Sequence, residues 1–173
     1  NIIRPEKSLT EAVATMDVLK AKTLPTGAPV GFSLLNPQEV KVYERGGSII
    51  LKPYVESRWK DQEHGPLLWK PVNGDADLVA RILVSQTLDT TASPDAGFQI
   101  GGLMLRVDGE QENHLFFALG CMGNPNLKMV CQNTINGNSA TYVTKTERHE
   151  MILRIRRKGS LISFYTKESD AGD

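Results

Sequence analysis

Apolar and polar residues alternate in short runs over most of this chain, and Gly, Asn, Asp and Pro interrupt the runs at short intervals. Residues 97–131 show the pattern most clearly, because their apolar stretches are of strand length and are separated by such turn-forming residues. This pattern is typical of antiparallel strands joined in hairpins. Since it continues through most of the chain after about residue 40, the sequence predicts an all-β fold.

Turn residues divide the apolar runs into individual strands. Gly46 and Gly47 supply the positive φ angles that a tight hairpin requires between strands at 40–44 and 48–52. Asn136-Gly137 and Lys158-Gly159 are further two-residue turn signals. The remaining predicted strands cover residues 67–70, 78–84, 98–107, 115–121, 127–131 overlapping with 129–134, 140–146, 150–157 and 160–167.

About ten strands with no helix between them indicate two antiparallel sheets stacked face to face, which is a sandwich or jelly roll. Residues 98–107 are apolar on both faces, so we expect this strand in the middle of a covered sheet.

The first part of the chain differs from the rest. Ser8 and Glu11 have the spacing of a capping box, and apolar residues recur at helical intervals through residues 8–20. This segment is either a short amphipathic helix or an extended lead-in, and residues 24–37 are predicted to be irregular. We therefore expect an N-terminal lead-in segment at 1–38 that packs on a β-sandwich domain at 39–173.

The length, composition and charge of the chain bear on its number of domains and on nucleic-acid and membrane partners. The chain has 173 residues, 40% hydrophobic and 23% charged, which is sufficient for one domain with a sizeable core. Lys+Arg and Asp+Glu balance at 20 each without a basic stripe, so a nucleic-acid partner is not expected. No apolar run approaches the roughly 20 residues of a membrane-spanning helix. The chain begins at Asn1 with neither an initiator Met nor a signal-peptide h-region, which is expected of a processed extracellular or periplasmic protein or of a shortened chain.

The two cysteines are predicted to be free thiols. In the hairpin formed by residues 115–121 and 127–131, Cys121 would face residues 127–129 and Cys131 would lie near Leu119. The thiols would then be diagonal neighbours at best, about 7 Å apart, which is at the limit for a disulfide. Without a nearby Cys or His pair, a zinc site is not expected either.

Three blocks of the sequence carry a resemblance to a known superfamily. They read GSIILKPYVESRWKDQEHGPLLWKPVNGDADLVARILV, GLMLRVDGEQENHLFFALG and LRIRRKGSLISFYTKESDAG, within residues 46–172. In order and spacing they resemble bacterial domains of the concanavalin A-like lectin/glucanase superfamily. The resemblance implies a jelly roll whose concave face binds an oligo- or polysaccharide, in a secreted bacterial protein that is a glycoside hydrolase or an accessory module of one.

The resemblance also carries an expectation about the end of the chain. After Asp170 this sequence reads Ala-Gly-Asp, where the superfamily continues through a Trp and further strands. The domain is therefore expected to be incomplete at its C-terminus, which would leave a sheet edge to be covered by other residues.

Hydrolases of this superfamily carry carboxylates at alternate positions of one strand, which places them on one face. Asp108, Glu110 and Glu112 have that spacing, but Gly, Gln and Asn intervene where a central strand requires apolar residues. We therefore interpret residues 108–113 as a solvated turn. A hydrolase remains an alternative, with Asp108, Glu56 and Glu63 as its candidate catalytic carboxylates.

Glycan binding requires an exposed aromatic ring with planar polar groups around it. The candidates are Tyr54, Arg58, Trp59 and His64, which lie together in an irregular stretch; alternatively, Trp59 caps one end of the core.

Further binding candidates lie near the acidic turn and on a late strand. Arg106 and His114 flank the turn and are candidates to line the same concave face as Arg154 or Arg156. The alternative is that these arginines form cross-strand ion pairs with Glu110, Glu112 or Glu150. Tyr142, in a Thr-rich strand typical of a half-exposed surface, is a second aromatic candidate.

Calcium and other cofactors have little support in the sequence. Asp75, Asp77, Asp89 and Asp95 are the candidate ligands of a structural calcium ion, but no dense Asp-x-Asp-x-Asp-Gly loop is present. No cofactor is therefore expected.

The sequence leads to a carbohydrate-binding, non-catalytic or accessory β-sandwich domain. Two alternatives stay open: a glycoside hydrolase, and a structural or interaction domain.

Overall fold

The computed structural model describes residues 31–169 except 61–63, 87–88, 90, 95–96 and 108–111. These residues fall into two compact units, one made of described residues up to Val72 and the other beginning at Asn73. The predicted helix at 8–20 and the end of the chain at 170–173 lie outside the described residues. None of the described segments forms a helix with the length and apolar character needed to cross a membrane.

The smaller unit contains two antiparallel ribbons. β2 (Val40–Arg45) pairs with β3 (Ser48–Pro53) through a turn in which Gly46 and Gly47 both have positive φ, as predicted. β1 (Ser33–Leu35) pairs with β4 (Leu67–Trp69), and the 3-10 helix η2 (Pro37–Glu39) connects the ribbons. The prediction that 24–37 is irregular is therefore wrong at β1, because this strand depends on a partner that lies far along the chain.

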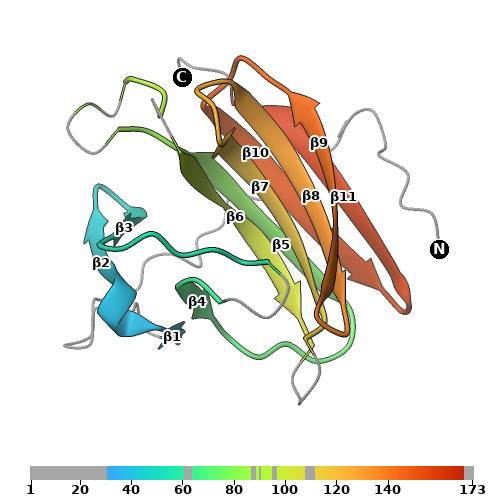
Figure 1. Cartoon of the computed structure of the whole chain (residues 1–173). Coiled ribbons are helices and arrows are strands. Elements are labelled where there is room, and N and C mark those ends of the chain that lie inside the picture. The colour runs from blue at the N-terminus through green and yellow to red at the C-terminus, as the bar shows by residue number, and fades with distance from the viewer. Residues whose placement is uncertain are drawn as a thin grey trace. The chain divides into compact units, whose positions relative to one another are not determined.

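The larger unit is an antiparallel two-sheet sandwich, as the sequence predicts (Figure 1). One sheet has the order β11-β10-β5 and the other has the order β6-β7-β8-β9. The bounds of these strands are β5 (Ala76–Leu83), β6 (Phe98–Arg106), β7 (His114–Met122), β8 (Leu127–Ile135), β9 (Asn138–Lys145), β10 (Glu150–Lys158) and β11 (Leu161–Glu168).

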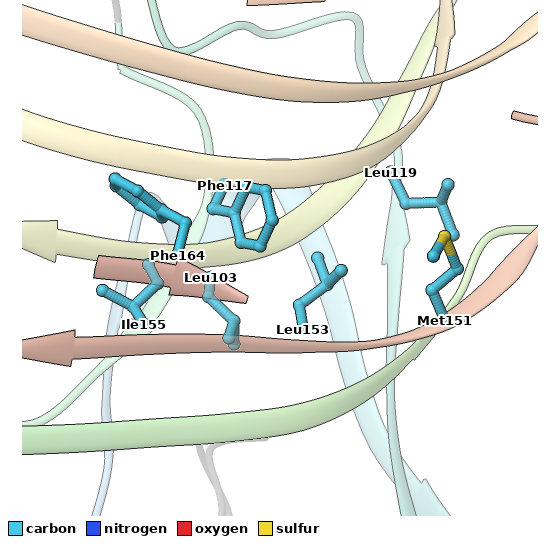
Figure 2. Packing of buried hydrophobic residues seen from close by; sticks show 7 residues of the cluster. All are labelled: Leu103, Phe117, Leu119, Met151, Leu153, Ile155 and Phe164. Atoms are coloured by element: carbon cyan, nitrogen blue, oxygen red, sulfur yellow. The ribbon is translucent and has the colours of Figure 1, made fainter. Parts of the chain in front are cut away.

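Alternating side chains of the two sheets meet in one core. Leu153 and Ile155 of β10 are fully buried against residues of β6, β7 and β11. The rings of Phe117 and Phe164 pack with their centroids 5.1 Å apart, and Figure 2 shows the side chains of Leu119 and Met151 directed toward each other. Burial of each such side chain contributes about 1.5–3 kcal/mol, so this core holds the sheets together.

Two details of the strand arrangement correct the sequence predictions. β6 is apolar on both faces but lies at the edge of its sheet, so its predicted central place is wrong. The pattern of apolar side chains along a strand shows which of its faces are covered. Whether the strand lies at the edge or in the centre of a sheet depends on backbone pairing with other strands. The last hairpin pairs Lys158 with Leu161, so its turn is Gly159-Ser160, one residue later than predicted.

Both cysteines are free, as predicted. Cys121 is opposite Leu127, whereas Cys131 is opposite Phe117 and not Leu119, so the thiols lie further apart than diagonal neighbours. Burial raises the pKa of the Cys131 thiol.

Candidate functional site

The four-stranded sheet has a second face, turned away from the sandwich core. Strand alternation places Leu115, Phe117 and Leu119 in the core, so the intervening residues of β7 point to the opposite face. We call this the outer face of the four-stranded sheet. Its middle is apolar, with Phe116, Ala118 and Val130 buried together.

One end of this outer face is polar across all four strands. The strand register aligns Arg106, His114, Thr134 and Ser139 in one cross-strand row. The next row contains Gln132 and Thr141 opposite each other. We call these six residues the polar row; they are Arg106, His114, Gln132, Thr134, Ser139 and Thr141.

Hydrogen bonds connect the polar row from strand to strand. The Thr134 hydroxyl lies 3.0 Å from Nε2 of His114 and 2.8 Å from the hydroxyl of Ser139. The Gln132 amide donates to the Thr134 hydroxyl at 3.4 Å, and its carbonyl accepts from the Thr141 hydroxyl at 3.4 Å. Because each group is held by its neighbours, the row presents its polar atoms in fixed positions.

The loops at this end of the sheet are tied to the polar row. Arg106 forms an ion pair with Glu112 at 3.2 Å, across the connection between β6 and β7. The backbone N–H of Asn136 donates to the Asn113 side chain at 3.0 Å, and that of Gly137 donates to the Glu112 carbonyl. Asn136 and Gly137 both have positive φ, as the predicted two-residue turn requires.

Exposure varies along the polar row. His114, Gln132 and Thr134 are buried, whereas Arg106 and Thr141, on the edge strands β6 and β9, are exposed. A ligand bound on the outer face can therefore contact the polar row at Arg106 and Thr141, on the two edge strands. The buried residues between them support these two positions.

Of the three alternating carboxylates Asp108, Glu110 and Glu112, the structure describes only Glu112, and Glu112 does not lie on a strand. β6 ends at Arg106 and β7 begins at His114, so Glu112 belongs to the connection, as the turn interpretation predicts. Asp108 and Glu110 lie outside the described residues, as does Glu63. Glu56 is exposed just after β3 in the smaller unit.

The predicted aromatic group lies in the smaller unit. Trp59 is half-buried, with its ring 5.2 Å from that of His64 and its Nε1 donating to the Pro66 carbonyl at 3.5 Å. A Cβ at Gly65 would lie 3.1 Å from the Trp59 ring, so the indole packs directly on this glycine. These contacts favour the alternative in which Trp59 has a structural role.

The other aromatic and basic candidates are exposed. Tyr54 and Arg58 are exposed in the segment after β3, and Tyr142 is 68% exposed on β9. The register places Tyr142 opposite Cys131, so it points to the core side of its sheet and away from the polar row.

Arg154 and Arg156 do not share a face with Arg106 and His114. Both alternate along β10 with core residues Leu153 and Ile155, so they point outward from the three-stranded sheet, on the opposite side of the sandwich. Arg154 forms a two-pronged ion pair with Asp77 and lies over the ring of Tyr165. Arg154 does form a cross-strand ion pair, but its partner is Asp77, which was not among the predicted partners Glu110, Glu112 and Glu150.

The candidate calcium ligands have other partners. The Asp75 carboxylate accepts from the Gly159 backbone N–H, Asp77 pairs with Arg154, and Asp89 accepts from Thr91. Asp95 lies outside the described residues. Over the part of the chain that the structure describes, no group of three metal-ligating side chains occurs.

Sequence patterns missed four members of the polar row. Gln132, Thr134, Ser139 and Thr141 look like ordinary polar positions of strands in the sequence. The Asn136-Gly137 hairpin predicts that β8 and β9 pair, so aligning them across this turn would place Gln132 opposite Thr141. Their alignment with His114 depends on the further pairing of β7 with β8.

No protein-family model, curated protein or solved structure matches this chain.

Proposed function

We propose that this chain is a carbohydrate-binding β-sandwich domain of the concanavalin A-like kind, and that it binds through the polar row on the outer face of the four-stranded sheet. The observation that carries the proposal is the row itself, in which polar side chains of all four strands occupy one end of a sheet face. Saccharide hydroxyls both donate and accept hydrogen bonds, and guanidinium, amide and hydroxyl groups match both roles.

The fixed positions of these groups support a binding role. Thr141 and Arg106 are exposed, while their buried neighbours hold hydrogen bonds with one another. A site whose polar groups are already oriented loses less conformational entropy when a ligand binds. Sugars, which gain little affinity per hydroxyl against competing water, profit from such preorganisation.

The composition of the sheet favours binding over hydrolysis. Glycosidases use a pair of carboxyl groups about 5–9 Å apart beside the scissile bond. Strands β6, β7, β8 and β9 contain no Asp or Glu, and Glu112 at the end of the row is engaged by Arg106. The hydrolase alternative would need carboxylates from loops.

The proposal is tested with a glycan array probed with the purified protein, followed by titration of each glycan that binds. The double variant Arg106→Ala/Thr141→Ala removes the two exposed members of the row and keeps the hydrogen bonds that join Thr134 to His114, Gln132 and Ser139. We expect affinity to fall by about tenfold or more, since each lost hydrogen bond to a polar ligand costs about 0.5–1.5 kcal/mol.

The matched control is Arg45→Ala/Thr144→Ala, which removes the same side chains from exposed positions outside the row. Equal binding by both double variants would contradict the proposed site. Absence of binding to every glycan would favour a structural or interaction domain, and release of reducing ends from a bound glycan would favour the hydrolase.

A further inference from the structure

A hollow lies at one end of the three-stranded sheet, where β5 begins and the β10–β11 hairpin turns. It has a volume of about 220 Å³ and is open to solvent. Its lining is almost entirely charged, and consists of Asp75, Ala76, Asp77, Arg156, Arg157 and Lys158. The hollow is separate from the polar row, because it belongs to the other sheet of the sandwich.

Both carboxylates of the hollow are already engaged. Asp75 accepts from the backbone N–H of Gly159 at 2.8 Å, which fixes it against the hairpin turn. Asp77 accepts from Nε of Arg154 at 2.7 Å and makes a second contact with the same guanidinium. The hydrogen bond from Arg154 and the charges of Arg154 and Arg156 hold the pKa of Asp77 below its ordinary value.

The three cations are not engaged in this way. Among the described residues, Arg156, Arg157 and Lys158 form no ion pair and no side-chain hydrogen bond. Asp77 is paired with Arg154 and also feels the charge of Arg156, so two carboxylates, Asp75 and Asp77, face four cations around one small hollow when Arg154 is included. Such an arrangement leaves an excess of positive charge and of N–H donors.

We propose that this hollow is a binding site for a compact oxyanion, a sulfate or phosphate group, either free or carried as a substituent on a saccharide. Arginine presents its N–H groups in a planar fork that pairs with two oxygens of one anion, and lysine adds a point charge. The site does not rest on the proposed function, because it uses none of the residues of the polar row.

The first experiment titrates the isotope-labelled protein with inorganic sulfate and follows the backbone amides by NMR at constant ionic strength. We expect saturable shifts at Ala76, Arg157 and Lys158, which line the hollow. The variant Arg156→Gln/Lys158→Gln should weaken binding by about tenfold, since charge-assisted hydrogen bonds are about twice as strong as neutral ones. Lys41→Gln/Lys52→Gln removes the same charge from exposed strand positions and should leave affinity unchanged.

A second variant changes affinity in the opposite direction. Asp75→Asn keeps an acceptor for the Gly159 N–H but removes the lining carboxylate that does not pair with Arg154, so sulfate should bind more tightly by about threefold to tenfold. A gain of binding cannot result from loss of the fold. Weaker binding or no change in this variant would overturn the proposal.

Two further arms identify the source of the anion. Tighter binding of a sulfated oligosaccharide than of free sulfate, with the same response to the variants, would assign the anion to a saccharide; equal binding would assign it to the free ion. The proposal fails if the amide shifts do not saturate, if the Lys41/Lys52 control weakens binding equally, or if a DNA duplex competes more strongly than the sulfated saccharide.

Discussion

The two outer faces of the sandwich use polar side chains in different ways. On the four-stranded sheet, His114, Gln132 and Thr134 are buried and joined by hydrogen bonds between their side chains. Two of these three residues, Gln132 and Thr134, have uncharged side chains. On the three-stranded sheet, Arg81 pairs with Glu150 and Arg154 pairs with Asp77 at partly exposed positions.

The difference follows from the cost of burial. A buried neutral group needs only a hydrogen-bond partner, whereas a buried charge loses several kcal/mol of hydration. Ion pairs at the surface avoid that cost but are weakened by water and salt. The stabilising contribution of the buried hydrogen bonds on the four-stranded sheet should therefore depend on how well their atoms are placed. The contribution of the ion pairs on the three-stranded sheet should depend on pH and ionic strength.

The largest effect should come from the core that both faces share. Leu153→Ala removes a fully buried side chain and should lower the free energy of unfolding by about 2–5 kcal/mol. Urea unfolding followed by circular dichroism of the strands measures it, because both tryptophans, Trp59 and Trp69, lie in the smaller unit. Leu161→Ala, at a 63% exposed position, should change stability by less than about 0.5 kcal/mol. Similar losses in the two variants would show that the sheets do not meet at Leu153.

A glycine on the four-stranded sheet should be nearly as sensitive. Gly120 has φ +145°, and a Cβ there would collide with the carbonyl oxygen of Gln99 on the neighbouring strand. Gly120→Ala should cost at least about 1–3 kcal/mol in backbone strain and loosen the β6–β7 pairing.

Amide hydrogen exchange of β6 measures this effect. The control is Gly123→Ala, which also has positive φ but whose Cβ would meet only the Phe98 ring at 3.7 Å. If β6 amides exchange equally fast in both variants, the close approach at Gly120 is not what maintains the pairing.

The hydrogen-bonded network of the polar row should respond to removal of one hydroxyl. Thr134→Val keeps the shape of the side chain but removes the oxygen shared by His114 and Ser139, so we expect a loss of about 1–3 kcal/mol. Thermal unfolding in low and high salt measures it, and the loss should not depend on salt. Thr144→Val, exposed on β9, serves as the control and should be nearly neutral.

The ion pair of the other face should give the smallest effect and one that depends on pH. The folded-state pKa of Asp77 lies below its ordinary value of 3.8, mainly because Arg154 donates to the carboxylate. Its contribution is therefore present above about pH 4 and is lost as pH falls through the folded-state pKa. Since Asp77 is 43% exposed, we expect less than about 1 kcal/mol.

Comparison with Asp77→Asn at pH 7 and at pH 2.5 measures this contribution. The variant should be less stable at pH 7, and the difference should shrink at pH 2.5 and in high salt. A difference that stays constant across pH would mean that the Asp77 charge does not stabilise the sandwich.

Much of the fold could be predicted from the sequence, because the features that mark strands and turns involve residues that are close together in the chain. Gly46-Gly47 and Asn136-Gly137 lie in turns with positive φ, and the hairpins around them were predicted. β1 was missed because its pairing partner, β4, is distant in the chain. The candidate site was less accessible: Arg106 and His114 were identified, but Gln132 and Thr134 joined them only through the pairing of β7 with β8.

The sequence by itself determined the all-β class, most strands and the free state of both cysteines. The period-two alternation of side chains and the special φ angles of turn residues are properties of neighbouring residues, so no tertiary information is needed. Only the tertiary structure decided that β6 is an edge strand, that polar residues of separate hairpins align in one row, and that Asp77 pairs with Arg154. These outcomes depend on which strands pair and which sheets stack, and burial of the shared core selects that arrangement.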